Sequence, residues 1–335
     1  MTIIGVSGIG SIGARHARVL AGIDGVSVLV QDPYAGDAEI RRRVGHRVTV
    51  IAGFPELLDR APDGIVVASP ESAHVGQTLS AIGAGIPVLL EKPVAGSLAD
   101  GLRLAGPPHR TTNRTVPVLV GYVLRHYRCM NRAWSLIADG AIGRPISFHV
   151  DLGAYETLEL ARNRFEHAPP GTVYADYSHE WDYLRWWLGD IVAGCAVEQT
   201  ITSLPLVQRP NVVDALLRLA DGVAGSVHLD YLQSPGHRRI TVIGDAGTLS
   251  VDVGGGSVVL TPRGAAEAEI MDCSQQRDHA FAAQAGHFLA VIRGQAEPVV
   301  GIADGLSALA TADALRRSGA AGGEWVRIDP VRLGD

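Results

Sequence analysis

The chain has 335 residues, the length of about two ordinary domains, and its 47% hydrophobic and 19% charged residues are typical of globular proteins. A formal net charge of −6 at pH 7 argues against a protein that binds nucleic acid through an overall positive surface. No eighteen apolar residues follow one another, so no membrane-spanning helix is expected.

The three cysteines, Cys129, Cys195 and Cys273, lie far apart and include no Cys-x-x-Cys pair. This pattern predicts neither a disulfide framework nor a zinc site, and it is typical of proteins in a reducing compartment. The first residues, MTIIGVSGIG, lack the basic stretch and cleavage site of a signal peptide. We therefore expect a cytoplasmic protein with no metal, no membrane partner and no nucleic-acid partner.

The first 121 residues alternate short apolar runs with amphipathic stretches. The apolar runs are residues 2–7, 26–31, 48–52, 64–68, 86–90 and 116–120. Near-continuous runs of β-branched residues indicate strands covered on both faces, as in a parallel sheet. Strands separated by helical stretches predict an α/β fold, with a doubly wound Rossmann domain over residues 1–121.

A G-x-G-x-x-G motif follows the first apolar run and opens a helical stretch. In this motif the first glycine permits a tight turn, the second lets a pyrophosphate approach the backbone, and the third allows close helix–strand packing. The helix N-terminus then offers N–H groups to the phosphates. The predicted cofactor-binding residues here are Gly8, Gly10, Ser11, Ile12 and Gly13.

Asp32 ends the second apolar run, nineteen positions after Gly13. A carboxylate at this place accepts hydrogen bonds from the adenosine ribose and repels a 2′-phosphate. No Arg or Lys occurs in residues 33–40 to hold such a phosphate. The sequence therefore favours NAD over NADP, although Asp32 also begins an Asp-Pro turn.

After Gly121 the pattern changes, and we assign residues 122–335 to a second domain. Helical patterns at residues 131–139, 179–188, 277–294 and 302–318 accompany a strand at 145–152 and longer strands joined by short turns over 192–261. This order predicts an α+β domain with a large, mostly antiparallel sheet and helices on one face.

Two segments of this sheet, residues 215–219 and 223–229, place apolar side chains partly on each face. A sheet with helices on one side only would leave its other face apolar and exposed, and such faces are usually buried between subunits. We therefore expect a homodimer or homotetramer that forms through the C-terminal sheet.

Two sequence stretches near the ends of the fourth and fifth predicted strands carry a family resemblance. They are Val67-Ala68-Ser69-Pro70-Glu71-Ser72-Ala73-His74 and Leu89-Leu90-Glu91-Lys92-Pro93. With them the chain resembles the glucose–fructose oxidoreductase and inositol dehydrogenase (Gfo/Idh/MocA) family over nearly its whole length. Gly121-Tyr122 with Arg125 resembles the family's crossing into its second domain. The resemblance implies an NAD(P)-dependent oxidoreductase that acts on CH–OH groups.

The resemblance also implies roles for residues of the first domain. Lys92 would hydrogen-bond the reacting substrate oxygen near the nicotinamide, and the Lys92–Pro93 bond would be cis. Ser69, Pro70, His74, Glu91 and Lys92 would line the cofactor. Independently, both loops leave the carboxyl ends of parallel strands, where open α/β sheets bind ligands.

In the second domain the resemblance implies that His179 is the catalytic acid/base and that Asp176 assists it. Asp176 and His179 are three residues apart, so on one helix they would share a face, and Asp176 would orient the imidazole or join it in a proton relay. This sequence departs from the usual family spacing, which would place the Asp on Ala175. Glu180 should point away from His179. We expect this segment and the Lys92 loop to converge over the nicotinamide.

Polar and aromatic residues on loops are candidates for substrate binding. They are Arg125, Tyr155, Arg162, Asn163, Arg164, His179 and His237. Their mixture of donors suits a polyol, and the arginines leave an acidic or phosphorylated sugar open. The aromatic run from Trp181 to Trp187 has helical spacing, and we interpret it chiefly as core packing between the domains.

We therefore expect hydride transfer between NAD and a secondary alcohol of a sugar, a sugar derivative or a cyclitol. Two alternatives stay open. One is a redox-neutral lyase or glycosidase that retains its NAD, and the other is a non-catalytic NAD-binding sensor.

Overall fold

The computed structural model describes residues 1–106, 110–111, 114–160 and 169–333. The chain forms two compact units. The first contains Met1–His126, Gln276–Leu306 and Val331–Asp335, and the second contains Tyr127–Gln275 and Ser307–Pro330. Among the described residues, no helix is both long and apolar enough to cross a bilayer.

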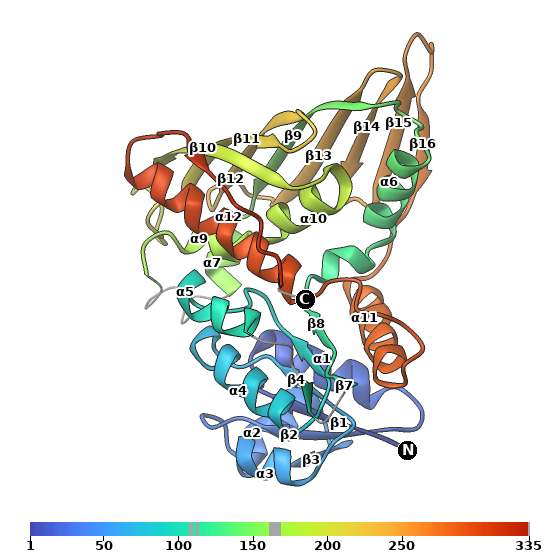
Figure 1. Ribbon diagram of the computed structural model, residues 1–335, viewed down its shortest axis with the longest axis vertical. Helices are drawn as coiled ribbons and strands as arrows, with labels where there is room; N and C mark the ends of the chain where they lie inside the picture. The colour runs from blue at the N-terminus through green and yellow to red at the C-terminus, as the bar shows by residue number, and fades with distance from the viewer. Residues whose placement is uncertain (107–109, 112–113, 161–168, 334–335) are drawn as a thin grey trace. The chain divides into compact units, whose positions relative to one another are not determined.

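The first unit is built on a six-stranded parallel sheet with the order β3-β2-β1-β4-β5-β8 (Figure 1). Its strands are β1 (Thr2–Ser7), β2 (Val26–Gln31), β3 (Val48–Val50), β4 (Gly64–Val67), β5 (Val88–Leu90) and β8 (Val118–Val120). Six strands stand where the sequence predicts them, and β1 and β2 have the predicted bounds. The order runs outward in both directions from β1 and β4, as in a doubly wound Rossmann fold.

Helices connect these strands. They are α1 (Ser11–Ala21), α2 (Asp37–Val44), α3 (Phe54–Asp59), α4 (Glu71–Gly83), α5 (Leu98–Gly101) and the 3-10 turn η1 (Leu102–Ala105). A second 3-10 turn, η2 (Val123–His126), follows β8. The short strands β6 (Arg110–Thr111) and β7 (Arg114–Thr115) pair antiparallel.

Helix α11 (Arg277–Ile292) belongs to this first unit, whereas the sequence analysis placed it in the second domain. Asp278 pairs with Arg15 of α1 at 2.8 Å, and the Phe281 ring meets the His16 ring edge-on. Ile292, the last residue of α11, lies close to Gly64 of β4: a Cβ atom on Gly64 would be 2.5 Å from the Ile292 side chain. A late segment of the chain therefore returns to cover the first sheet.

The second unit contains a nine-stranded sheet with the order β16-β15-β14-β13-β9-β12-β11-β10-β17. Its strands are β9 (Pro145–Gly153), β10 (Ile191–Gln199), β11 (Val212–Leu219), β12 (Ala224–Asp230), β13 (His237–Gly244), β14 (Gly247–Asp252), β15 (Ser257–Pro262), β16 (Glu269–Asp272) and β17 (Val326–Arg327). The pair β9–β12 is parallel, and the other neighbouring pairs are antiparallel. The prediction of a large, mostly antiparallel sheet is confirmed.

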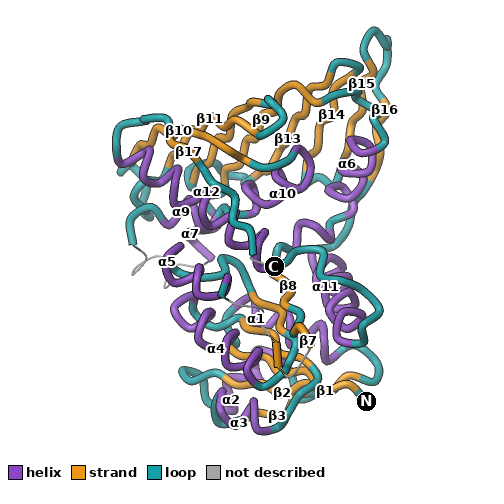
Figure 2. The backbone as a smooth tube through the Cα atoms, viewed as in Figure 1, coloured by secondary structure: helices purple, strands orange, loops and turns teal. Residues whose placement is uncertain are grey.

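Helices lie against one face of this sheet (Figures 1 and 2). The helices that the structure describes in the second unit are α6 (Arg128–Ala138), α7 (Glu156–Leu160), α9 (Thr172–Asp176) and α10 (His179–Leu188). Helix α12 (Ile302–Ala320) begins in the first unit and continues in this one.

The opposite face is more polar than the sequence analysis assumed. Along β11 the buried residues alternate with exposed Asp214, Leu216 and Arg218. Leu216 is 51% exposed, but the neighbouring β12 presents Ser226 and His228 beside it. The premise of an apolar open face does not hold for β11 and β12, because most of their outward positions are polar.

His126, at the end of η2, gives the first unit a pH-dependent stability. Burial, followed by the nearby His287 and Arg125, lowers the pKa of His126 from 6.5 to about 4. Below pH 6.5 the His126 imidazole of the unfolded chain is therefore protonated, whereas that of the folded chain stays neutral down to about pH 4. The free energy of unfolding consequently falls as the pH drops through this window.

Replacing His126 by Leu should remove this contribution. Between pH 7 and pH 4.5 the wild-type protein should lose about 2–3 kcal/mol more unfolding free energy than the His126→Leu variant. Urea unfolding at a series of pH values measures the difference. Parallel losses in the two proteins would show that His126 does not carry the effect.

Candidate functional site

The glycine loop between β1 and α1 has the backbone of a phosphate-binding turn. Gly8 has φ of +88°, and a Cβ there would lie 2.5 Å from the Ala68 carbonyl oxygen. A Cβ at Gly13 would collide with the Gly8 carbonyl, whereas a Cβ at Gly10 would meet nothing within 4 Å. Gly8 and Gly13 are thus required by the loop itself, and Gly10 leaves an open approach to the backbone.

Helix α1 presents its N-terminus at this loop. Its first intrahelical bond runs from the Ala14 N–H to the Gly10 oxygen at 2.9 Å, so the N–H groups of Ser11 and Ile12 have no partner within the helix. No side chain caps the helix, and its first turn contains no acidic residue. These residues fit a dinucleotide, whose pyrophosphate needs N–H donors and a positive dipole end.

Asp32 lies beside the same loop. Its Oδ2 accepts a hydrogen bond from the Ile9 N–H at 2.7 Å, and its Oδ1 accepts one from the Tyr34 N–H at 2.8 Å. The carboxylate is therefore held in place while each oxygen keeps a further lone pair. This geometry suits acceptance from two ribose hydroxyls.

Arg43 reaches the glycine loop from α2, which sequence spacing did not indicate. Its Nη1 donates to the Ile9 carbonyl at 2.8 Å, and its Nη2 pairs with Glu39. Arg43 lies eleven residues after Asp32 and is brought back to the loop by the turn into α2. Arg43 supports the loop.

A chain of polar side chains joins the carboxyl ends of β1, β2 and β4. The Gln77 Oε1 accepts from Ser7 Oγ at 2.8 Å and from Ser69 Oγ at 2.9 Å, and Gln31 Nε2 donates to Ser7 Oγ at 2.5 Å. These hydrogen bonds fix Ser69, a predicted cofactor-binding residue. Pro70, the next residue, is exposed.

His74 joins the loops that follow β4 and β5. It is 1% exposed, and its Nδ1 and Nε2 lie 2.9 Å from the carbonyl oxygens of Pro93 and Ser69 respectively. Carbonyl oxygens only accept, so each contact is made by an N–H of the imidazole when that nitrogen carries the proton. His74 thus couples the Ser69 loop to the Lys92 loop, and its contact with the cofactor stays a prediction.

Lys92 follows β5, and the Lys92–Pro93 peptide is cis, as predicted. Glu91 is 8% exposed; its Oε1 lies 2.7 Å from Nε2 of the fully buried His16 on α1, and its Oε2 accepts from the Lys92 N–H at 3.2 Å. A Cβ at Gly121 would lie 2.8 Å from this carboxylate, so Gly121 makes room for it. Glu91 therefore fastens the Lys92 backbone to the helix that starts at the glycine loop, a link that the sequence did not reveal.

In the second unit, Asp176 and His179 do not share one helix. Asp176 is the last residue of α9, and His179 is the first residue of α10, with Tyr177 and Ser178 forming a turn between them. The expectation of a common helical face is therefore wrong, because the helix breaks at Tyr177. Asp176 is 7% exposed and accepts a hydrogen bond from the Tyr231 hydroxyl at 2.9 Å.

Glu180, directly after His179, forms a buried ion pair that the sequence analysis missed. Its carboxylate is fully buried and lies 2.8 Å from Arg238 Nε of β13. Burial alone would lower the pKa of Arg238, but the Glu180 carboxylate raises it above its ordinary value. The pair fixes the first turn of α10 to the sheet.

The aromatic run packs mainly as core. Trp181 and Tyr183 are fully buried, and Trp181 Nε1 donates to the Tyr174 carbonyl at 2.9 Å. Trp186 instead stacks on the partly exposed Trp134, with ring centroids 5.6 Å apart.

The predicted substrate residues fall in different surroundings. The Arg125 side chain is 8% exposed in the first unit, donates to the Val299 carbonyl at 3.0 Å and lies 3.9 Å from Asp304. Tyr155 of the second unit accepts at its hydroxyl from the Leu206 N–H at 3.3 Å. Arg162 lies outside the described residues, as do Asn163 and Arg164.

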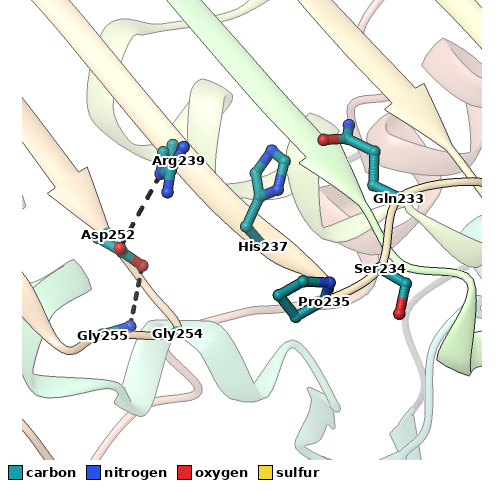
Figure 3. Close-up of a pocket in the computed structure, with 9 residues that line it drawn as sticks. Gln233, Ser234, Pro235, His237, Arg239, Asp252, Gly254 and Gly255 are labelled. Atoms are coloured by element: carbon teal, nitrogen blue, oxygen red, sulfur yellow. Dashed lines mark hydrogen bonds and ion pairs between the residues drawn. The ribbon is translucent and has the colours of Figure 1, made fainter.

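His237 lines a cavity of about 540 Å³ in the second unit (Figure 3). The cavity lies where β13 begins and β14 ends, and Arg239 and Asp252 also face it. His237 pairs with Asp151 of β9 at 2.9 Å. None of the predicted catalytic residues lines this cavity.

Comparison with protein families matches both halves of the chain. Residues 2–116 match the model of an oxidoreductase family with an NAD-binding Rossmann fold, and residues 130–250 match the GFO/IDH/MocA C-terminal domain.

Two curated relatives are dehydrogenases of cyclitols. Inositol 2-dehydrogenase 1 of Saccharopolyspora erythraea is 31% identical over 271 residues, which cover 77% of each chain. The scyllo-inositol 2-dehydrogenase (NAD(+)) of Bacillus subtilis is 26% identical over 312 residues, covering 88% of this chain and 87% of that one. Among solved structures, an inositol dehydrogenase homolog from Azotobacter vinelandii, complexed with NADH and myo-inositol, has a TM-score of 0.80 at 18% identity, with 97% of each chain covered. At this identity the structural likeness shows the fold.

Proposed function

Because the chain belongs to the GFO/IDH/MocA family of oxidoreductases, we propose that it uses NAD to oxidise a secondary alcohol of a cyclitol, a sugar or a sugar derivative. The observation that carries this proposal is the setting of Lys92. Lys92 lies in the loop that follows β5. His74 connects this loop to the Ser69 loop, and Glu91 connects it to α1, whose N-terminus fits a pyrophosphate.

Composition adds a second reason to assign Lys92 a function. Lys92 is the only lysine in the chain, and every other cationic side chain apart from histidine is an arginine. An ammonium is a compact donor that can lose its proton, whereas a guanidinium is larger, planar and permanently charged. Arginine occurs at every other such position, and the one lysine follows β5. This supports a role for Lys92 that an arginine cannot fill.

In the proposed reaction Lys92 donates a hydrogen bond to the reacting hydroxyl oxygen and orients it. His179 accepts the hydroxyl proton, and Asp176 supports the imidazole as its positive charge develops. NAD, when bound, would accept at its nicotinamide the hydride that leaves the carbon bearing this hydroxyl. Reduction uses the same residues in reverse, with His179 returning the proton.

NAD is the proposed cofactor in preference to NADP, and Asp32 is the residue that discriminates. The Asp32→Asn variant keeps an oxygen for the Ile9 N–H but loses the negative charge that opposes a 2′-phosphate. We expect the ratio of kcat/KM for NADP to that for NAD to rise by at least about 10-fold. Asp37→Asn, which alters an exposed acid of α2 paired with Arg41, is the matched control and should leave the ratio unchanged. An unaltered ratio in Asp32→Asn would remove Asp32 from cofactor choice.

The proposed activity is tested with a panel of cyclitols, neutral sugars, sugar acids and sugar phosphates, each incubated with NAD while NADH absorbance at 340 nm is followed. Saturable NADH formation with at least one polyol is expected. Tight NAD retention with substrate conversion but no NADH would favour the redox-neutral alternative. NAD binding without conversion of any compound would favour a sensor.

A further inference from the structure

Asp176 receives its hydrogen bond from a residue 55 positions later in the chain. The Tyr231 hydroxyl donates to Asp176 Oδ2 at 2.9 Å, and both side chains are buried, with Tyr231 0% exposed. A buried carboxylate is stabilised in its ionised form by such a donor, because little water is present to replace it.

Tyr231 is itself held firmly. It follows the last residue of β12, Asp230, whose Oδ1 accepts from the N–H groups of Leu232 at 2.6 Å and Gln233 at 2.9 Å and so turns the chain after the strand. The Tyr231 N–H donates to the Asn211 carbonyl at 3.0 Å. The hydroxyl is therefore presented to Asp176 by a fixed backbone.

The ring of Tyr231 is fixed as well. It lies against the Tyr177 ring, with centroids 5.1 Å apart, and the Tyr177 hydroxyl donates back to the Asp230 carbonyl at 3.1 Å. Tyr177 belongs to the turn between α9 and α10, so one aromatic pair joins the end of β12 to the segment that carries Asp176 and His179.

We propose that Tyr231 is a positioning residue for the catalytic site: its hydroxyl orients Asp176 and keeps it ionised, so that Asp176 can support His179. This role rests on the proposed function. The charged and titratable groups near the cluster include Tyr177, His179, Glu180 and Arg238, as well as Asp230, which pairs with His228. The Glu180–Arg238 pair is internally neutralised, and the Tyr231 hydroxyl donates to Asp176 directly.

The Tyr231→Phe variant removes one oxygen and keeps the ring. The matched control is Tyr183→Phe, because Tyr183 is equally buried in the same unit and its hydroxyl forms no hydrogen bond within the described part of the chain. If packing alone mattered, the two variants would behave alike.

The first measurement does not depend on activity. Carboxyl carbon NMR of protein labelled in its aspartates follows the titration of Asp176, whose signal is assigned by its loss in Asp176→Asn. In Tyr231→Phe the titration midpoint should move up by about one pH unit, as expected when a hydrogen bond to an ionised group is lost. In Tyr183→Phe it should stay in place. A midpoint unchanged by Tyr231→Phe would overturn the proposal, whatever reaction the protein catalyses.

The second measurement uses the best substrate of the polyol panel. We expect Tyr231→Phe to lower kcat about 10- to 100-fold and to move the acidic limb of its pH profile to higher pH, with unchanged NADH binding. In an Asp176→Asn background the same substitution should have little further effect, because the two residues act as a unit. If Tyr231→Phe lowers kcat by the same factor in the wild-type and the Asp176→Asn proteins, the proposed role is contradicted. A wild-type protein that converts no compound of the panel would refute the proposed function, and the NMR titration would then decide the role of Tyr231.

Discussion

Replacing Lys92 by Ala is expected to lower kcat by at least about 100-fold while the protein still binds NADH. The ammonium is proposed to touch the reacting oxygen, and loss of such a donor and of proton-transfer geometry typically costs 10²–10⁴-fold in rate. Steady-state NADH formation measures the loss, and NADH fluorescence titration measures binding. Full activity in Lys92→Ala would refute the assignment.

The Lys92→Arg variant separates position from charge. It keeps a cation and restores the residue type used everywhere else in the chain, yet it should be almost as slow as Lys92→Ala because a planar guanidinium cannot take the place of the compact ammonium. A further test uses the absence of other lysines. Reductive methylation can modify only Lys92 and the N-terminal amine, so inactivation that saturating substrate prevents would place Lys92 at the site.

Replacing Arg238 by Met is expected to lower the free energy of unfolding of the second unit by about 3–5 kcal/mol. Glu180 is fully buried, and without Arg238 its charge would lose the partner that lies 2.8 Å away. Removing one member of a buried pair costs this much because the remaining charge is left without compensation. Because Glu180 follows His179, turnover should fall as well.

The double variant Arg238→Met with Glu180→Gln controls for packing. It removes the stranded charge, so it should recover more than half of the lost stability in urea unfolding. If the single and double variants unfold at the same urea concentration, the ion pair is not the source of the effect.

The parts of the fold that could be predicted from sequence are those whose cause is local. Strands β1 and β2 were predicted with their bounds because strands buried on both faces need continuous apolar runs. The membership of α11 could not be predicted in this way. Its apolar pattern indicates a helix with a buried face, but not which sheet that face covers.

In the candidate site, too, the local motifs could be predicted from the sequence and the long-range contacts could not. The glycine loop, Asp32 and the Glu91-Lys92-Pro93 turn are short motifs whose geometry follows from neighbouring residues. The contacts that hold them come from far along the chain: His16 is 75 residues from Glu91, and Tyr231 is 55 residues from Asp176. The turn at Tyr177 was missed because a spacing of three residues assumes an unbroken helix.

The central proposal is tested most directly by following deuterium from the oxidised carbon of the best polyol substrate. Direct dehydrogenation predicts NADH that carries one deuterium at nicotinamide C4, together with a released ketone. Deuterium that returns to the sugar product, or is lost to water while no NADH accumulates, would contradict it.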